Sequence, residues 1–99
     1  KYPQKGSKFY QKILVKKGAS IGANATIVCG NTIGKHAFIA AGAVITTNID
    51  DYSLMAGIPA KRLGWISEHG EKLVFKNGIA LCSTSRDKYQ LKNNIVIKV

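Results

Sequence analysis

Residues 9–49 read FYQKILVKKGASIGANATIVCGNTIGKHAFIAAGAVITTNI, and this stretch decides the fold. Within it, a large aliphatic or aromatic residue recurs at every sixth position, at Phe9, Val15, Ile21, Ile27, Ile33, Ile39 and Ile45. Because six is an even number, an extended chain points all these side chains to the same face of its strands, whereas a helix spreads them around its circumference. The spacing therefore predicts short strands at regular intervals.

Small residues alternate with the large ones. The position four residues after each large residue is mostly small, at Ile13, Ala19, Ala25, Asn31, Ala37, Ala43 and Ile49. Such alternation fills a narrow interior whose corners are tight, and glycines recur beside these corners. A six-residue period is typical of an all-β parallel β-helix. A β-sandwich is the less favoured alternative, because its turns fall at irregular spacings of about 8–12 residues.

The chain has 99 residues, and the repeats occupy only part of it. Each rung of a coil buries its faces against neighbouring rungs, so we expect this short stack to be the C-terminal part of a longer protein. We divide the chain into a basic loop (1–8), the hexapeptide coils (9–50), an exit (51–65) and a C-terminal cap (66–99).

The exit and the cap have their own local signals. Residues 52–64 are small, apolar and turn-rich, and the pattern of residues 65–73 favours a short helix. Asn77-Gly78 and Asn93-Asn94 each separate two apolar stretches, which predicts two tight hairpin turns. The cap is therefore expected to contain a small antiparallel meander that covers the end of the coil.

The net charge is +10, and residues 1–20 contain six lysines and no acidic residue. Such a field attracts anions, and either a solvated loop or a site for a phosphorylated small molecule accounts for it. We expect no nucleic acid partner, because the basic residues form no helical stripe and no aromatic stacking motif accompanies them.

Apolar runs in this chain fall well short of the roughly 18 residues that span a bilayer, and residues 1–20 contain no apolar signal-peptide core. These features predict a cytoplasmic protein without a membrane span. Cys29 and Cys82 belong to no CxxC pair, so we expect plain thiols and no metal site.

Four segments carry a family resemblance: VKKGASIGANATIVCGNTIG (15–34), AFIAAGAVITTNI (37–49), AGIPAKRLGW (56–65) and SEHGEKL (67–73). Together they resemble the hexapeptide-repeat acyltransferases. The nearest likeness is to the N-acetyltransferases that act on the 3-amino group of UDP-2-acetamido-3-amino-2,3-dideoxy-glucuronate. This resemblance implies a left-handed β-helix, a homotrimer, acetyl-CoA bound between subunits, and a nucleotide-sugar substrate for surface polysaccharide biosynthesis.

The resemblance also implies positions for the acetyl-CoA contacts. Ala23 and Ala41 match small residues beside the pantetheine arm, although a role as mere corner residues is equally compatible with the sequence. Thr46 and Thr47 match a Thr-Lys pair, with the usual lysine absent here. Lys61 and Arg62 match a basic turn that meets the CoA phosphates, and such cations suit phosphate recognition.

The catalytic residue stays unknown. Amide formation requires an amine to attack the thioester carbonyl, backbone N–H groups can stabilise the oxyanion, and a histidine is the usual base. We expect His36 to lie at the surface or at a subunit contact and His69 to be structural. The base is therefore expected outside these 99 residues.

Two other functions remain open. A γ-type carbonic anhydrase needs three imidazoles around one zinc ion, and only His36 lies within the coils, which disfavours that enzyme. A non-catalytic assembly module, or one that binds anions or nucleic acid through its positive charge, is the main alternative to the acetyltransferase.

Overall fold

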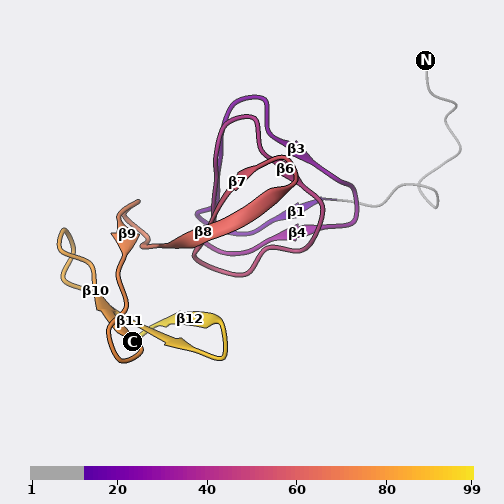
Figure 1. Cartoon of the computed structure of the whole chain (residues 1–99). Helices are drawn as coiled ribbons and strands as arrows, with labels where there is room; N and C mark the ends of the chain where they lie inside the picture. Colours follow the sequence, from indigo (N-terminus) through magenta and orange to yellow (C-terminus); the bar gives the residue numbers. More distant parts are fainter. Residues whose placement is uncertain (1–12) are drawn as a thin grey trace, which may run out of the picture.

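The structure, a computed structural model, describes residues 13–99. The described part of the chain is all-β, with twelve strands (Figure 1). Six two-residue strands come first: β1 (Leu14–Val15), β2 (Ser20–Ile21), β3 (Thr26–Ile27), β4 (Thr32–Ile33), β5 (Phe38–Ile39) and β6 (Val44–Ile45). Longer and shorter strands follow: β7 (Ser53–Gly57), β8 (Ala60–Ile66), β9 (Lys72–Leu73), β10 (Ile79–Leu81), β11 (Lys88–Lys92) and β12 (Ile95–Lys98).

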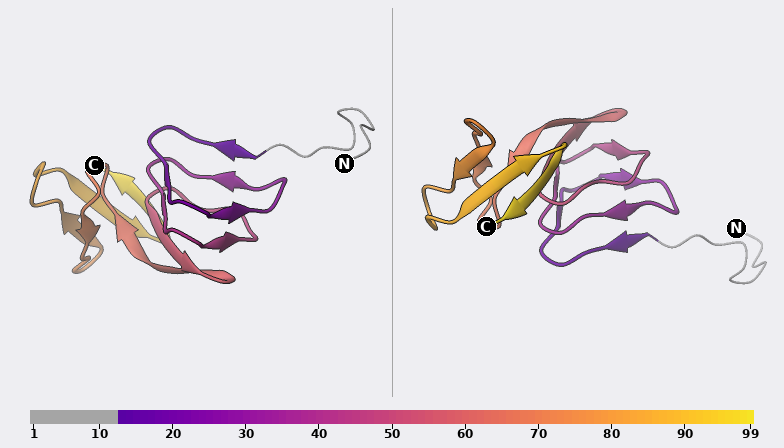
Figure 2. Two further views of the ribbon diagram at one scale, coloured as in Figure 1. Left: turned by 90° about the horizontal axis from the view of Figure 1, so that it is seen from above. Right: turned by 90° about the horizontal axis from the view of Figure 1, so that it is seen from below.

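Each of the first three strands pairs in parallel with the strand one turn later. β1 pairs with β4, β2 with β5 and β3 with β6, and Leu14 lies beside Thr32 in the first of these pairs. The chain thus passes through three strands before it returns to the same side, and successive turns stack as layers (Figure 2). This confirms the predicted strand spacing for the described residues, whereas Phe9 lies outside them.

The repeated large residues are the second residues of these strands, and they fill the interior of the coil. Ile33, Ile39 and Ile45 in the second turn are completely buried, together with Ala37 and Ala43 at the predicted small positions. The alternation of large and small residues therefore packs the coil as the sequence predicted.

The exit from the coil is a hairpin, which the sequence analysis did not predict. β7 runs parallel to β5, and β8 then returns antiparallel to β7 around Ile58-Pro59. β9 pairs in turn with β8, with Trp65 opposite Leu73. These five strands, β2-β5-β7-β8-β9, form the largest sheet in the described part of the chain.

The helix predicted over residues 65–73 was wrong. Trp65 ends up in β8, and the chain then makes a turn in which the Ser67 N–H donates to the Glu71 carbonyl. Gly70 has a φ of 80° in this turn, which a right-handed helix does not accommodate. Sheet pairing on both sides of the turn thus overrides the weak helical pattern.

Both predicted tight turns are present in the cap. Asn77 and Gly78 have φ values of 53° and 79°, and Asn93 and Asn94 have 54° and 61°, as two-residue hairpins of type I′ require. The second turn joins β11 and β12, so the predicted meander β10-β11-β12 is confirmed. The first turn closes only one bridge, between Lys76 and Ile79, because β9 pairs with β8 instead.

A second core joins the meander to the exit of the coil. Its buried residues come from both parts of the chain: Tyr52, Trp65, Leu73, Ala80, Cys82, Tyr89 and Val96. The meander lies beside the exit strands (Figure 2). It packs on them through this apolar and aromatic cluster.

Candidate functional site

One corner of the coil exposes main chain and small side chains. Ala23 and Ala41 each follow a strand of the β2-β5 pair by two residues, and both are exposed. The Gly42 N–H donates to the Ala23 carbonyl at 2.9 Å, which stacks the two turns directly. A Cβ atom added at Gly22 would lie 2.4 Å from the Ala41 nitrogen, so this packing requires glycine. An extended ligand can lie along such a corner without meeting a bulky side chain.

The β7–β8 hairpin continues the same corner by one further layer. Ile39 lies beside Met55, so Gly57 occupies the place in β7 that Ala41 has after β5. Lys61 is exposed on β8 opposite Ala56. The register therefore brings a cation to the end of the line formed by Ala23 and Ala41.

Arg62 is held by neighbours within the chain. Its guanidinium carbon lies 4.2 Å from the centroid of the Trp65 ring, and its Nη1 atom lies 3.8 Å from Asp50 Oδ2. The expectation that Lys61 and Arg62 sit on a turn was wrong, because both belong to β8 and the turn is at Ile58-Pro59. Both cations are exposed, and Arg62 has contacts with Trp65 and Asp50 within the chain.

Thr46 and Thr47 lie at another corner. They follow β6, which pairs with β3 and not with β2 or β5. The structure therefore does not bring these two threonines beside Ala23 and Ala41 within one chain. Asn48, next to them, has a structural contact: its Oδ1 atom accepts the Thr32 N–H at 2.8 Å.

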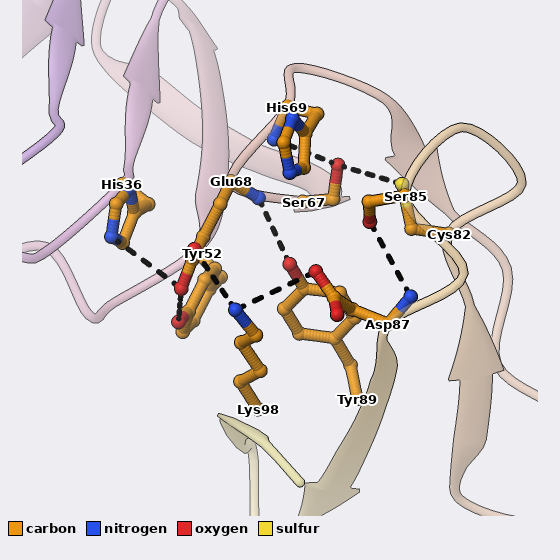
Figure 3. Close-up of polar contacts among 10 residues, drawn as sticks. All are labelled: His36, Tyr52, Ser67, Glu68, His69, Cys82, Ser85, Asp87, Tyr89 and Lys98. Atoms are coloured by element: carbon orange, nitrogen blue, oxygen red, sulfur yellow. Dashed lines mark hydrogen bonds and ion pairs between the residues drawn. The ribbon is translucent and has the colours of Figure 1, made fainter.

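His36 is packed between the coil and the exit (Figure 3). Its ring stacks on Tyr52, its Nε2 atom lies 3.6 Å from Glu68 Oε2, and its side chain is only 17% exposed. The other nitrogen, Nδ1, faces Gly18, where an added Cβ would lie 2.2 Å from it. The expectation of a surface position was therefore wrong, whereas the alternative of a subunit contact stays a prediction. Within the described residues, neither ring nitrogen faces an open site where it could deprotonate an amine.

Glu68 is the centre of a polar network beneath this stack (Figure 3). Its carboxylate accepts the Tyr52 hydroxyl at 2.9 Å and the Lys98 ammonium at 3.3 Å. Burial opposes ionisation of Glu68, but these hydrogen bonds outweigh it and lower the pKa of the carboxyl. Burial of the Tyr52 phenol, followed by its hydrogen bond to the Glu68 carboxylate, raises the pKa of Tyr52. Lys98 also approaches Asp87 at 3.5 Å, so the network ties the last strand to the coil.

The turn after β8 is tied to the meander by hydroxyl groups (Figure 3). Ser67 Oγ accepts the backbone N–H groups of His69 and Glu71, each at 3.2 Å, and lies 3.4 Å from Cys82 Sγ. Hydrogen bonds with the hydroxyls of Ser67 and Ser85 lower the pKa of the buried Cys82 thiol. His69 itself is exposed and contributes its backbone to this turn.

Comparison with known proteins gives three informative likenesses. No protein-family model matches the chain. The dTDP-3-amino-3,6-dideoxy-α-D-galactopyranose 3-N-acetyltransferase of Aneurinibacillus thermoaerophilus is 42% identical over 87 residues, which are 88% of this chain and 45% of that relative. The structure of a hexapeptide-repeat acetyltransferase from Vibrio cholerae O1 biovar eltor, complexed with acetyl coenzyme A, matches with a TM-score of 0.56 and 30% identity. This match covers 58% of this chain and 31% of that one.

Both of these similar proteins are acetyltransferases, and the Vibrio structure is named for its hexapeptide repeats. A galactoside acetyltransferase in complex with coenzyme A also matches, with a TM-score of 0.57, 28% identity, and coverage of 68% of this chain and 34% of that one. The chain spans less than half the length of each of these acetyltransferases.

One groove in the described part of the chain lies away from the expected acetyl-CoA contacts. It has a volume of about 380 Å³ and is lined by Lys16, Thr32, Gly34, Asn48, Ile49, Asp50, Asp51 and Ile95. None of the six residues expected to contact acetyl-CoA lines it. Within residues 13–99, no three His, Cys, Asp or Glu side chains are grouped to hold a metal ion. The same residues include no helix long and apolar enough to cross a membrane.

Sequence reasoning missed the Glu68 network. Its members are His36, Tyr52, Glu68, Asp87, Tyr89 and Lys98. They lie on different strands and turns, and no motif of fixed spacing links them. A usable signal was the placement of two tyrosines among apolar positions, because a buried phenol needs a hydrogen-bond partner.

Proposed function

We propose that the whole protein transfers an acetyl group from acetyl-CoA to an amino group of a nucleotide-linked amino sugar. The likeness to the Aneurinibacillus 3-N-acetyltransferase, at 42% identity over most of this chain, carries this proposal. The exposed corner at Ala23 and Ala41, with Lys61 at its end, supports it.

In this proposal the coil is a left-handed β-helix within a homotrimer, and acetyl-CoA lies along the corner. The pantetheine amides meet the main chain at Ala23 and Ala41, where small side chains leave it accessible. Lys61 contacts the CoA phosphates, and Arg62 assists from its place against Trp65. Thr46 and Thr47, at another corner, belong to the site only through a neighbouring subunit.

Acetyl transfer requires few catalytic groups from the protein. The amine attacks the thioester carbonyl, the tetrahedral oxyanion collapses, and CoA leaves as a thiolate, while the amine proton passes to a base. Backbone N–H groups beside the carbonyl stabilise the oxyanion. His36 is enclosed by Gly18, Tyr52 and Glu68, so we assign the base to a group outside the described residues.

The sugar and nucleotide are a finer part of the proposal. The sequence resemblance suggests a UDP-linked 3-amino uronate that serves surface polysaccharide synthesis. The Aneurinibacillus relative is named for a dTDP-linked 3-amino-3,6-dideoxygalactose. Both are nucleotide-linked sugars with an amino group at C3, so we propose 3-N-acetylation as the shared reaction. Acetylation assays with UDP-linked and dTDP-linked 3-amino sugars distinguish the two.

The binding site is tested by calorimetric titration of acetyl-CoA into the intact protein. Lys61→Ala removes a phosphate contact and is expected to weaken binding by about tenfold, or about 1.4 kcal/mol. Lys76→Ala is the matched control, because Lys76 is equally charged and exposed but lies in the meander turn.

Equal affinities for the two variants would remove Lys61 from the site. Failure of the intact wild-type protein to bind acetyl-CoA would contradict the enzymatic proposal itself. The hexapeptide coil would then be a scaffold shared with the acetyltransferases, and the non-catalytic assembly module would become the better explanation.

A further inference from the structure

Two strands of the meander are apolar on both of their faces. β10 reads IAL (79–81), and β12 begins with IVI (95–97). Successive side chains of a strand point to opposite faces, so a sheet with one face in water alternates apolar and polar residues. An unbroken apolar run is instead typical of a strand that is covered on both faces.

Only one face of the meander is buried in the described part of the chain. Ala80 and Val96 belong to the second core, where β10 and β12 pack toward the exit. Their neighbours on the same strands are between 43% and 52% exposed: Ile79, Leu81, Ile95 and Ile97. Both strands therefore have a second apolar face that stays exposed among residues 13–99.

The register of the sheet places lysines among these aliphatic side chains. Residues that lie opposite each other on neighbouring strands share a face of the sheet. Lys88 lies opposite Leu81, and Lys92 lies opposite Ile95. The same register and one further bridge define a surface that we call the outer face of the meander. It includes Lys76, Ile79, Leu81, Lys88, Gln90, Lys92, Ile95 and Ile97.

These residues of the outer face include no carboxylate. Asp87 precedes β11 and lies 3.5 Å from Lys98, which is on the opposite face of the sheet. At one border, Ile95 also lines the groove that contains Asp50 and Asp51, and each of these aspartates has a contact within the chain. The charge that the outer face presents is therefore positive.

We propose that the outer face of the meander docks on an anionic lipid surface. Its aliphatic side chains enter the boundary between headgroups and acyl chains. The lysine stems lie along them, with the ammonium groups at the lipid phosphates. Lys76, Lys88 and Lys92 each strengthen binding by about fivefold. The proposal does not depend on the acetyltransferase activity, because none of the expected acetyl-CoA contacts lies in the meander.

The composition of the outer face favours lipid over a protein partner. Protein interfaces are depleted in lysine and depend on tryptophan, tyrosine and arginine for most of their affinity. The outer face has lysines and aliphatic residues and none of those three types. A second copy of the chain would bring the same lysines together, which opposes association. A lipid surface accepts lysine and aliphatic side chains next to each other.

The test is co-sedimentation of the intact protein with phosphatidylcholine vesicles that contain about one-third phosphatidylserine. The wild type is expected to bind these at least about tenfold more tightly than pure phosphatidylcholine vesicles. Lys88→Gln/Lys92→Gln removes two charges and is expected to weaken binding by about thirtyfold. Lys17→Gln/Lys35→Gln removes the same charge from exposed positions on the coil. This control is expected to bind within about twofold of the wild type.

The apolar contact is tested separately from the charge. Ile79→Ser/Ile97→Ser keeps every lysine and is expected to weaken vesicle binding by at least about tenfold. Val28→Ser is the matched control, because Val28 is an aliphatic residue of the coil with a comparable exposure of 46%. It is expected to bind as the wild type does. Thermal melts check that each variant is folded.

A soluble headgroup distinguishes docking on a bilayer from binding of a single anion. Titration with glycerophosphoserine is expected to leave the amide NMR signals of Lys88 and Lys92 unchanged. Saturable shifts of these signals would contradict docking on a surface and assign the lysines to a small anion.

Two further results would overturn the proposal. Binding to anionic vesicles that survives both the lysine and the isoleucine substitutions would place the contact elsewhere on the molecule. Absence of vesicle binding by the intact wild type would show that the outer face does not meet lipid. If Ile79→Ser/Ile97→Ser then also lowered the oligomeric state in sedimentation velocity, the face would belong to a contact with a second copy.

Discussion

The imidazole of His36 stacks on the phenol ring of Tyr52, with their centroids 5.4 Å apart and their planes 18° apart. His36 belongs to the second turn of the coil and Tyr52 to the exit, and Glu68 contacts both rings through its carboxylate. Tyr89 meets the edge of Tyr52 from the meander, at a centroid distance of 5.3 Å. Tyr52 thus contacts one ring of the coil and one of the meander, in addition to the pairing of β5 with β7 and the second core.

Removing the Tyr52 hydroxyl tests this junction. Tyr52→Phe keeps the stacked ring and deletes a hydrogen bond to a charged acceptor, so the free energy of unfolding should fall by about 1–2 kcal/mol in urea titrations. The pKa of Glu68 should also rise, measured by NMR of its carboxyl carbon, because one interaction that favours its ionised form is lost. Tyr52→Ala should cost more, because it also deletes the stack. A Glu68 pKa that is unchanged in Tyr52→Phe would show that this hydrogen bond is absent in solution.

Alanine substitutions at equivalent positions in successive turns should lower the free energy of unfolding by different amounts. Ile39→Ala creates a cavity at a completely buried site and should cost about 2–5 kcal/mol. Ile21→Ala, at the same place one turn earlier, should cost less than half as much because Ile21 is 42% exposed. Chemical denaturation of the two variants measures both values. Similar losses would mean that the first turn is covered in solution.

Two substitutions of alanine by leucine distinguish ligand binding at the exposed corner from packing of the buried interior. Ala41→Leu adds bulk at an exposed corner and should abolish acetyl-CoA binding while leaving the melting temperature unchanged. Ala43→Leu adds the same bulk to a fully buried position and should destabilise the fold by about 1–3 kcal/mol. Calorimetry and thermal melts distinguish the two effects. Normal binding by Ala41→Leu would argue against this corner as the pantetheine site.

Acid should weaken the tie between the turn after β8 and the meander. Hydrogen bonds from Ser83 and Thr84 hold the pKa of the Glu71 carboxyl at about 2, below its usual 4.5. Because the pKa is lowered in the folded state, the stabilisation is complete above about 4.5 and is lost as the pH falls toward about 2.

Glu71→Gln should therefore be less stable than the wild type at neutral pH, and the difference should shrink as the pH falls through that window. Urea unfolding of both proteins at several pH values measures it. A constant difference down to pH 2 would show that the Glu71 carboxylate does not make these hydrogen bonds.

Much of the coil was predictable because its information is local and repeated. The six-residue spacing of the large apolar residues predicts one strand around each of them. All six strands are present, at Val15, Ile21, Ile27, Ile33, Ile39 and Ile45. Asn93-Asn94 likewise marked the turn between β11 and β12, because asparagine tolerates the positive φ that such a turn requires.

The candidate site was predictable only in part. Ala23 and Ala41 come together because they are one turn of the repeat apart, and the sequence alone gives that spacing. Lys61 joins them only through the hairpin of β7 and β8, and although residues 52–64 are turn-rich, no strand pattern in the sequence predicted this pairing. Arg62 was expected on a turn, but Trp65 and Asp50 hold it within the sheet.

The sequence by itself determined the repeat, the strands of the coil, their interior residues and the two asparagine turns, because each depends on side chains a few positions apart. Tertiary structure decided the exit hairpin, the loss of the expected helix at residues 65–73 and the network around Glu68. The partners in that network lie far apart along the chain, from His36 to Lys98. Hydrogen bonds and ring contacts between such residues form only after the coil and the meander have packed, so no local pattern encodes them.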